Sequence, residues 1–394
     1  MKHIDNKSIA IIGGAGHVGF PLSLSFALKG FKVSLIDLNK RNLRKIKNGN
    51  VPFMEKGAEK ALRKCLKKNN LNFSSDLQSI KNNKYLIICI GTPIKNNLKP
   101  DLRSFFDLIK KLKKFISKDQ IIIVRSSVYP GVIEKVNSFL SQKNKNIVYC
   151  PERIVQGLAL EELPKLPQII AGRNKNAVER CTKLFKKICS KIIITNIIEA
   201  ELIKLFSNAN RYINFAIANQ LYMICDENGL NFAKIRKIMR EGYQRNLNLP
   251  LPGLTAGPCL LKDTMQLSSF YRNRFSLGIG AMKINESFPD LIIKKIKKIK
   301  NFKKKLIGVL GLSFKANSDD IRDSLAIKLI KKLKKNNIKF VATDEFYKGS
   351  EVISLKRLLK KSKIIVLGAP HNAYKKLKLE NKKIIDVWGF FEKN

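Results

Sequence analysis

Short apolar runs alternate with stretches of helical periodicity through the first half of the chain. The runs are rich in isoleucine and valine, which is the pattern of a parallel sheet with helices on both of its faces. The predicted strands cover residues 8–13, 32–37, 84–90, 120–125, 146–150, 167–171 and 190–194. Helices are predicted between them, for example over residues 17–29, 101–114 and 174–188.

The pattern changes after Glu199, where apolar residues recur at helical spacing without a breaker to about Asn228. A helix of that length spans about 45 Å. It is too long for one small domain, so we expect it to join two domains or to form a dimer interface. Helical patterns continue to about Lys300, interrupted by a loop rich in proline and glycine over residues 246–257.

Strand and helix patterns alternate again in the last third of the chain. Strands are predicted over residues 306–310, 338–342, 364–368 and 383–387, and helices over 321–335 and 354–361. We therefore predict an α/β fold in three parts. An N-terminal Rossmann-type domain covers residues 1–195, a central all-helical domain with one long helix covers 196–300, and a smaller Rossmann-like α/β domain covers 301–394.

The 394-residue chain carries a formal net charge of +47. Such a charge is typical of proteins that bind nucleic acid or membrane surfaces. However, the lysines are spread over most predicted helices, and asparagine and isoleucine are abundant too, which indicates a general compositional bias. We expect no nucleic-acid partner and no membrane span, because no apolar run is long enough. The positive field should still attract an anionic substrate such as a nucleotide diphosphate.

The seven cysteines form no Cys-x-x-Cys pair, and no secretory signal precedes the first predicted strand. This pattern predicts reduced thiols in the cytoplasm. The three histidines lie far apart in the sequence, which argues against a zinc site or a histidine-based triad. We therefore predict that the protein binds no metal.

A glycine-rich segment, Gly14-Ala15-Gly16-His17-Val18-Gly19, follows the first predicted strand and opens a helix. Such a turn lets the backbone approach a pyrophosphate at a helix N-terminus. Asp37 ends the next strand, where a carboxylate accepts hydrogen bonds from the adenosine ribose. The combination predicts binding of NAD in preference to NADP, although Lys40 and Arg41 lie nearby.

Three further polar segments follow predicted strands, at the edge where parallel sheets bind ligands. They are Gly91-Thr92-Pro93, Ser126–Gly131 and Cys150-Pro151-Glu152-Arg153. The first two are equally well explained as plain turns. Glu152 is placed to activate a water molecule, or to form a salt bridge with Arg153.

Lys204 and Asn208 are spaced i, i+4 on the long predicted helix, so their side chains share one face. An ammonium and an amide there can both donate to one oxygen and stabilise an alkoxide or an oxyanion. By itself, such a pair is more often solvated. We single it out because of the cysteine described next.

Cys259 follows Gly257-Pro258 and precedes a helical pattern. A helix N-terminus favours the thiolate, and Lys262 and Lys204 would favour it further. Asp263 is spaced i+4 from Cys259 and is placed to orient a lysine or a water. A lone cysteine is more often a small core residue. The polar surroundings of Cys259 instead indicate a nucleophile.

Together and in this order, these residues resemble those of the UDP-glucose/GDP-mannose dehydrogenase family, and the resemblance covers nearly the whole chain. It includes the segment Lys315–Ser324 in the last domain. The resemblance implies an NAD-binding domain, a central helical domain for dimerisation and catalysis, and a C-terminal domain that binds the nucleotide of a UDP-sugar. It therefore implies NAD as the cofactor, a UDP-sugar as the substrate and a homodimer formed through the central helix.

The resemblance also implies roles for individual residues. Cys259 is the nucleophile, Lys204 and Asn208 stabilise the oxyanion, Glu152 assists thioester hydrolysis, and Asp263 positions water or lysine, with Ser127 as a further catalytic residue. NAD binding is assigned to Gly14, Gly16, His17, Val18, Gly19, Asp37, Thr92, Ser127 and Lys262. Substrate binding is assigned to Arg153, Lys204, Asn208, Arg211, Gly253, Gly257, Lys315 and Arg322, the last of these across the dimer.

Two positions depart from the family pattern. Arg125 stands where family members usually carry a glutamate before the Ser-Thr-Val sequence, and Gln156 stands where many UDP-glucose enzymes carry a second glutamate. Glu152 is then the only candidate base in that segment. Its Cys-Pro-Glu-Arg context is more similar to the branch that acts on UDP-N-acetylhexosamines than to the UDP-glucose branch.

We therefore predict an NAD-dependent nucleotide-sugar 6-dehydrogenase. It would oxidise C6 of UDP-N-acetylhexosamine or UDP-glucose to the uronate in a four-electron reaction, through a thiohemiacetal and a thioester on Cys259. One alternative is a two-electron dehydrogenase of the hydroxy-acid type, which needs no cysteine. The other is a basic nucleic-acid-binding protein that retains a nucleotide fold.

Overall fold

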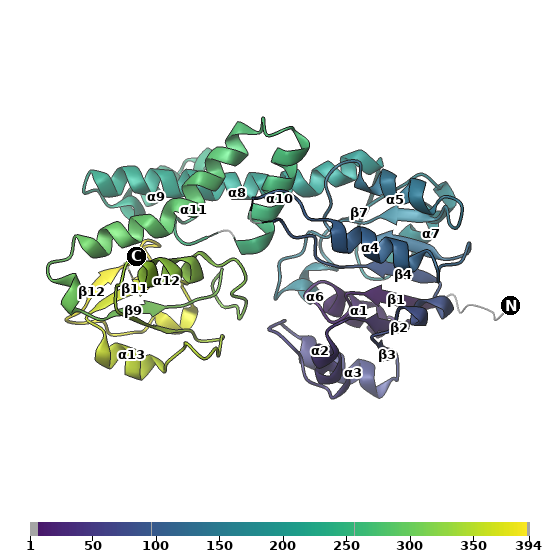
Figure 1. The fold of residues 1–394 in the computed structure, drawn as a ribbon, viewed down its shortest axis with the longest axis horizontal. Coiled ribbons are helices and arrows are strands. Elements are labelled where there is room, and N and C mark those ends of the chain that lie inside the picture. The colour runs from purple at the N-terminus through teal and green to yellow at the C-terminus, as the bar shows by residue number, and fades with distance from the viewer. Residues whose placement is uncertain (1–6, 96, 256, 392–394) are drawn as a thin grey trace. The chain divides into compact units, whose positions relative to one another are not determined.

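The computed structural model describes residues 7–95, 97–255 and 257–391. The chain divides into two compact units, residues 1–206 (unit 1) and 207–394 (unit 2). The division falls within one long helix, α8 (Ile197–Glu227), close to the range predicted from the sequence. In Figure 1 the ribbon is coloured by residue number, from purple at the N-terminus to yellow at the C-terminus, and helices and strands of both units are labelled.

Unit 1 is built on an eight-stranded sheet in the order β3-β2-β1-β4-β5-β6-β7-β8. The strands are β1 (Ser8–Ile12), β2 (Lys32–Ile36), β3 (Leu71–Ser74), β4 (Tyr85–Ile88), β5 (Ile121–Val124), β6 (Ile147–Tyr149), β7 (Gln168–Gly172) and β8 (Ile192–Thr195). The order of the first six strands is that of a dinucleotide-binding Rossmann sheet, which places the ligand edge at the carboxyl ends of β1 and β4.

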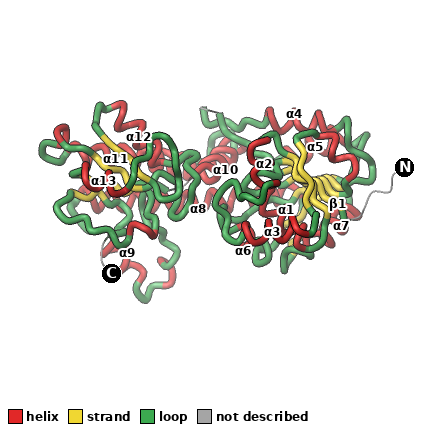
Figure 2. The backbone as a smooth tube through the Cα atoms, turned by 90° about the horizontal axis from the view of Figure 1, so that it is seen from below, coloured by secondary structure: helices red, strands yellow, loops and turns green. Residues whose placement is uncertain are grey.

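Helices cover both faces of this sheet (Figure 2). They are α1 (Gly19–Leu28), α2 (Lys40–Lys47), α3 (Ala58–Lys67), α4 (Arg103–Leu112), α5 (Val132–Leu140), α6 (Ala159–Glu162) and α7 (Lys175–Phe185). Alternate residues of β1 enter two separate cores. Ile9 and Ile11 pack with α1, α3 and α7, whereas Ala10 and Ile12 pack with α4 and α5. This alternation gives the layered α/β architecture that the sequence predicted.

Two features of the sheet differ from the prediction. β7 runs antiparallel to β6, with Tyr149 paired to Ala171, whereas we expected parallel strands throughout. The connection between these strands contains only the one-turn helix α6, and an antiparallel pair needs no crossover helix. The edge strand β3 was not predicted, because it has only four residues and only Leu71 among them is buried.

Unit 2 combines helices with a smaller, fully parallel sheet in the order β10-β9-β11-β12. Its strands are β9 (Ile307–Leu310), β10 (Phe340–Thr343), β11 (Ile364–Leu367) and β12 (Lys383–Ile385). Besides the second part of α8, its helices are α9 (Phe232–Arg240), α10 (Gly257–Phe270), α11 (Ser276–Lys297), α12 (Leu325–Lys335) and α13 (Leu355–Lys361). Short 3-10 turns cover Leu77–Asn82 in unit 1 and Gln244–Asn246, Phe302–Lys304 and Asn372–Tyr374 in unit 2.

The core of unit 2 joins α11 and α12 to the sheet. Phe288, Ile292 and Ile296 of α11 pack with the strands and with Leu329 and Leu333 of α12. Two salt bridges at the edge of this contact also link the helices, Lys328 to Glu286 and Lys332 to Asp290, each at 2.6 Å. Within the described residues, every helix is too short or too polar to cross a lipid bilayer.

Candidate active site

The glycine-rich turn lies between β1 and α1, at the carboxyl edge of the unit 1 sheet. A Cβ atom on Gly19 would lie 2.2 Å from the Gly13 carbonyl oxygen, and one on Gly14 would lie 2.9 Å from the Leu35 Cα atom. Neither position therefore has room for a side chain. Gly13 has φ +80°, so the left-handed bend of the turn lies one residue before the predicted motif.

Asp37 lies beside this turn, directly after β2. One carboxylate oxygen accepts a hydrogen bond from the Ala15 N–H at 3.0 Å, and the other accepts from the Asn39 N–H at 2.8 Å. The predicted ribose-binding carboxylate and the predicted phosphate-binding turn are thus joined by a direct hydrogen bond. A tight glycine turn, the start of α1 and a fixed carboxylate are the arrangement that a dinucleotide requires.

Two more residues lie close to the turn. The His17 ring packs on Phe53 with a centroid distance of 3.9 Å, and the Gln156 side-chain nitrogen lies 3.4 Å from His17 Nε2. Gln156, the residue that departs from the family's second glutamate, is therefore directed toward the predicted cofactor site and not toward Glu152.

Thr92 and Ser127 are brought together at the ends of β4 and β5. The Thr92 hydroxyl donates a hydrogen bond to the Ser127 carbonyl oxygen. Thr92 is buried, and the contact fixes both loops at the carboxyl edge of neighbouring strands. Ligands of open parallel sheets lie along that edge, and the role of Thr92 and Ser127 in cofactor binding stays a prediction.

Glu152 forms its ion pair with Arg125, and not with Arg153 as the sequence had offered. The Arg125 side chain is fully buried, its guanidinium contacts one oxygen of Glu152, and it donates to Gln168 Oε1 at 2.8 Å. The other Glu152 oxygen accepts from the backbone N–H groups of Arg153 and Ile154, at 2.7 and 3.0 Å. The Arg153 guanidinium instead donates to the Pro167 carbonyl oxygen.

The cation at position 125 thus neutralises the carboxylate at position 152. Burial lowers the pKa of Arg125. Because the guanidinium pKa starts from a very high value, Arg125 stays charged at neutral pH. The carboxylate of Glu152 is only partly buried, with 12% of its side chain exposed, so it remains accessible to water while its orientation is fixed.

On α8, Lys204 and Asn208 lie one turn apart, and Arg211 follows at i+3 from Asn208, so all three are on one side of the helix. Lys204 belongs to unit 1, whereas Asn208 and Arg211 belong to unit 2. Lys204 and Asn208 are buried and Arg211 is exposed. The spacing that the sequence predicted is therefore present on a continuous helix.

Asp263 links two other predicted site residues within unit 2. One of its carboxylate oxygens accepts from the Asn208 side-chain amide at 2.6 Å, and the other pairs with the Lys262 ammonium at 2.8 Å. Asp263 itself is fully buried. It therefore orients an amide on α8 and an ammonium on α10 at the same time.

Cys259 lies in the first turn of α10 and is the one exposed cysteine among the residues that the structure describes. Gly257, which begins the helix, has φ +52°, and a Cβ atom there would lie 2.3 Å from the Phe314 ring. Only glycine fits both the backbone conformation and the space. The position of the thiol is thus set by a glycine packed against an aromatic ring.

The loop before α10 is also fixed. Gly253 has φ +136°, and a Cβ atom there would lie 2.5 Å from the Trp388 ring. Its N–H donates to the Asn219 side-chain oxygen at 2.8 Å, and Asn219 in turn donates to Asn285 at 2.9 Å. Asn219 and Asn285 were not predicted as site residues, because a buried amide on a helix carries no sequence signal of its own.

Arg322 and Lys315 lie on the segment after β9. The Arg322 guanidinium makes a paired contact with Asp320, at 3.0 Å through Nε and 2.7 Å through Nη2, and 59% of its side chain is exposed. The hydrogen bond to Asp320 raises the pKa of Arg322, burial acts in the opposite direction, and the negative charge of Asp320 adds to the increase. The Lys315 ammonium lies 5.9 Å from the centre of the Phe314 ring.

These features define the class of the protein. A Rossmann sheet with a dinucleotide turn, followed by a helical region with an exposed cysteine and a second α/β unit, is the organisation of an NAD-dependent dehydrogenase with a separate substrate-binding domain. The sequence matches all three domains of one such family. The matches are its NAD binding domain over residues 7–189, its central domain over 198–287 and its UDP binding domain over 308–393.

The chain belongs to the UDP-glucose/GDP-mannose dehydrogenase family. It is 30% identical to a UDP-N-acetyl-D-mannosamine dehydrogenase of Methanococcus vannielii, over 98% of this chain and 94% of that protein. It is 25% identical to an NDP-N-acetyl-D-galactosaminuronic acid dehydrogenase of Ralstonia nicotianae, over 98% and 97%. Its fold is similar to that of the UDP-N-acetylmannosamine dehydrogenase structure from Pyrococcus horikoshii, with a TM-score of 0.86, 26% identity and coverage of 94% and 91%. The chain is thus an NAD-dependent nucleotide-sugar dehydrogenase.

Proposed function

We propose that the protein oxidises C6 of a UDP-N-acetylhexosamine, with UDP-N-acetylmannosamine as the preferred substrate, to the uronate in a four-electron reaction. Two of the relatives are named for N-acetylated nucleotide sugars, which supports this substrate class. The observation that carries the proposal is the exposed Cys259 in the first turn of α10, beside the Asn208–Asp263–Lys262 network. A two-electron dehydrogenase has no use for such a thiol.

The first half of the reaction converts the C6 alcohol to an aldehyde. Bound NAD supplies the chemistry of accepting a hydride in each of the two oxidation steps. Lys204 and Asn208 donate hydrogen bonds to the C6 oxygen, which stabilises the alkoxide as the hydroxyl proton passes to a water molecule. Asp263 keeps the Asn208 amide turned so that its remaining donor is available, and it holds the Lys262 ammonium in the same network.

The second half passes through Cys259. The thiolate adds to the aldehyde carbon, and the thiohemiacetal oxygen is stabilised by the same donors. Loss of the second hydride leaves a thioester on the sulfur. Water then adds to the thioester carbonyl and releases the carboxylate and the free thiol. The Arg125–Glu152 pair fixes the carboxylate that orients this water.

The remaining site residues serve binding. Gly14, Gly16, His17, Val18 and Gly19 shape the cofactor turn, and Asp37, Thr92, Ser127 and Lys262 complete the cofactor-binding set. Arg153, Arg211, Gly253, Gly257, Lys315 and Arg322 complete the substrate-binding set. We assign these functions to three domains, residues 1–195 for the cofactor, 196–300 for catalysis and dimerisation, and 301–394 for the UDP-sugar.

We further propose a homodimer formed through α8. Phe206, Ile217 and Ile224 are exposed large apolar residues, and their spacings of 11 and 7 residues place them in one stripe along the helix. An exposed apolar stripe of this kind is typical of a protein interface. The seven cysteines are free thiols, which supports a cytoplasmic protein.

The test measures how many NADH molecules form for each sugar consumed, with UDP-N-acetylmannosamine, UDP-N-acetylglucosamine and UDP-glucose as separate substrates. We expect two NADH per sugar and a uronate product detected by mass spectrometry, with the highest kcat/KM for UDP-N-acetylmannosamine. One NADH and a stable aldehyde from the intact protein would reject the four-electron reaction.

A pair of cysteine variants separates catalysis from structure. Cys259→Ser is expected to abolish formation of the acid while the protein still binds NAD. Cys225→Ala changes a buried cysteine on α8 and is expected to keep the wild-type stoichiometry. Wild-type turnover by Cys259→Ser would show that this thiol is structural.

A further inference from the structure

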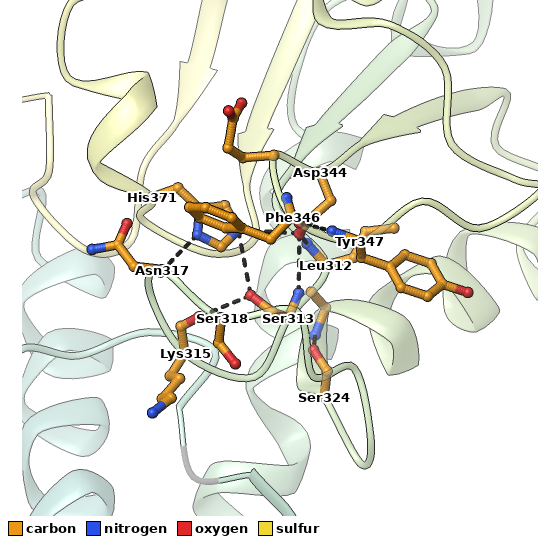
Figure 3. Close-up of polar contacts among 12 residues, drawn as sticks. Leu312, Ser313, Lys315, Asn317, Ser318, Ser324, Asp344, Phe346, Tyr347 and His371 are labelled. Atoms are coloured by element: carbon orange, nitrogen blue, oxygen red, sulfur yellow. Dashed lines mark hydrogen bonds and ion pairs between the residues drawn. The ribbon is translucent and has the colours of Figure 1, made fainter. Parts of the chain in front are cut away.

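His371 lies after β11, is fully buried, and uses its two ring nitrogens differently (Figure 3). Nδ1 accepts a hydrogen bond from the Asn317 backbone N–H at 2.8 Å. A ring nitrogen that accepts carries no proton, so the hydrogen is on Nε2. Nε2 lies 3.1 Å from Asp344 Oδ2 and 3.3 Å from the Ser313 hydroxyl. The ring is thus held in one tautomer and one orientation.

Asp344, directly after β10, holds three loops at the carboxyl edge of the unit 2 sheet. Oδ2 accepts from His371 and from the Leu312 N–H at 2.6 Å, and Oδ1 accepts from the Phe346 and Tyr347 N–H groups at 2.8 and 2.9 Å. Burial raises the pKa of Asp344, but these hydrogen bonds outweigh it and lower the pKa to about 2. The carboxylate therefore gives His371 a fixed acceptor.

The segment Ser313–Asn317 is closed onto this histidine. The Ser313 hydroxyl donates to the Lys315 carbonyl oxygen at 2.8 Å. Asn317 has φ +52°, and while its N–H donates to His371, its side-chain oxygen accepts from the Asn372 N–H at 2.9 Å. Two reciprocal hydrogen bonds thus join Asn317 to the His371–Asn372 dipeptide, far along the chain.

Two groups of the candidate active site depend on where this segment lies. The Phe314 ring fills the space at Gly257, two residues before Cys259. The Phe314 N–H donates to the Asp320 carbonyl oxygen at 3.0 Å, and the Asp320 carboxylate holds Arg322. If this segment moves, Phe314 therefore shifts against the start of α10, and Asp320 shifts together with the Arg322 guanidinium that it binds.

We propose that His371 is a positioning residue for the nucleotide sugar, which acts through its Nδ1 bond to Asn317 and so sets Phe314, Lys315 and Arg322 against the start of α10. This inference rests on the proposed function, since it assumes that Lys315 and Arg322 bind the nucleotide. The His371 side chain is fully buried, so its role is to position other residues and not to bind the substrate directly.

Two substitutions distinguish the two ring nitrogens. In His371→Asn the amide oxygen takes about the place of Nδ1 and keeps an acceptor for Asn317, but the side chain is too short to reach Asp344. In His371→Gln the amide nitrogen takes about the place of Nε2 and keeps the contact with Asp344, while Asn317 loses its acceptor. We expect His371→Gln to raise the KM for the UDP-sugar roughly tenfold, the effect of one lost buried hydrogen bond.

His371→Asn is expected to keep the KM for the UDP-sugar within about threefold of the wild-type value. In both variants kcat should change less than KM, and the dissociation constant for NAD should stay unchanged because the cofactor turn lies in unit 1. Equal KM values for the two variants, or a wild-type KM in His371→Gln, would overturn the proposal. Tyr374→Phe, which alters a neighbouring ring 5.3 Å away, is the matched control with an unchanged KM.

A readout independent of turnover is the rate at which iodoacetamide alkylates Cys259, followed by mass spectrometry with and without UDP. UDP should slow alkylation in the wild type and in His371→Asn, and much less in His371→Gln. Should His371→Gln fail to fold, Ser313→Ala removes the bond to the Lys315 carbonyl and is expected to reduce UDP protection in the same direction. Equal UDP protection in the wild type and the tested variant would refute the role of His371.

The two proposals fail separately. If no UDP-sugar is turned over but UDP still protects Cys259 in a His371-dependent manner, the proposed reaction is wrong and the positioning role stands. If turnover is as proposed and UDP protection is the same in all variants, only the positioning role is lost.

Discussion

The Arg125–Glu152 pair offers a direct test of how this chain holds the carboxylate that we propose assists thioester hydrolysis. Arg125→Met keeps most of the side-chain volume but removes the positive charge. The Glu152 carboxylate then keeps only its two backbone N–H donors, and the Gln168 oxygen loses a charged donor. The guanidinium also lies 5.2 Å from the centre of the Phe185 ring, a contact that methionine only partly replaces.

The expected loss of stability follows from these contacts. Removing one partner of a buried pair costs about 3–5 kcal/mol, and the remaining N–H donors place this case at the lower end. The lost bond to Gln168 adds about 1 kcal/mol. We therefore expect Arg125→Met to destabilise unit 1 by about 3–4 kcal/mol, and Glu152→Gln to cost a similar amount because it leaves the arginine unpaired.

The double variant completes the cycle. With both charges removed, the two losses should not add, and the coupling free energy should be about 2–3 kcal/mol. The measurement is hydrogen exchange of β5 and β6 peptides at increasing urea, which reports the opening of unit 1 separately from unit 2. The reasoning is refuted if the two single losses of unfolding free energy add up in the double variant. It is also refuted if Arg125→Met lowers that free energy by less than about 1 kcal/mol.

Three further outcomes are expected. Burial raises the pKa of the Glu201 carboxyl to about 7, although hydrogen bonds from backbone N–H groups act in the opposite direction. Folded unit 1 therefore binds the carboxyl proton more tightly than the unfolded chain does. The contribution of this group to the free energy of unfolding is full below about pH 4.5 and is lost as the pH rises through 7. In urea titrations, the free energy of unfolding of unit 1 should fall by up to about 3 kcal/mol over this pH range, and Glu201→Gln should not show this fall. Gly257→Ala should destabilise unit 2 by about 2–4 kcal/mol in thermal melts, from the positive φ and the contact with Phe314. Asp263→Asn should lower kcat at least about tenfold with an unchanged affinity for NAD, since it leaves Asn208 without its orienting carboxylate; an unchanged kcat would contradict that role.

The sequence predicted the sheets of both units well, because runs such as Ile121–Val124 are apolar throughout and bounded by polar residues. It also predicted the glycine turn and the start of α10, since glycine and proline constrain the backbone locally. The edge strand β3 and the reversed direction of β7 were missed. Both depend on pairing between distant segments, which the local pattern does not contain.

The contacts that organise the candidate site were the least predictable part. Arg125 was visible only as a departure from the family pattern, and its partner Glu152 lies 27 residues away. The two meet because Val124 of β5 pairs with Tyr149 of β6, so both charged residues follow at the same edge of the sheet. Asp344 and His371 follow β10 and β11, which both pair with β9 and so end at the same edge of the unit 2 sheet. In each case the register of a parallel sheet determines the contact.

Trp388 is the single tryptophan of the chain, and its indole ring is buried against Gly253, which belongs to the proposed substrate-binding set and lies in the loop before α10. Its Nε1 group donates to the Leu367 carbonyl oxygen at 3.2 Å, so the ring is anchored to the sheet on one side and faces the loop on the other. All intrinsic indole fluorescence of the protein therefore originates beside that loop. A change in emission on adding UDP-sugar reports the arrival of ligand in unit 2 without any label, and separately from the absorbance of the reduced cofactor.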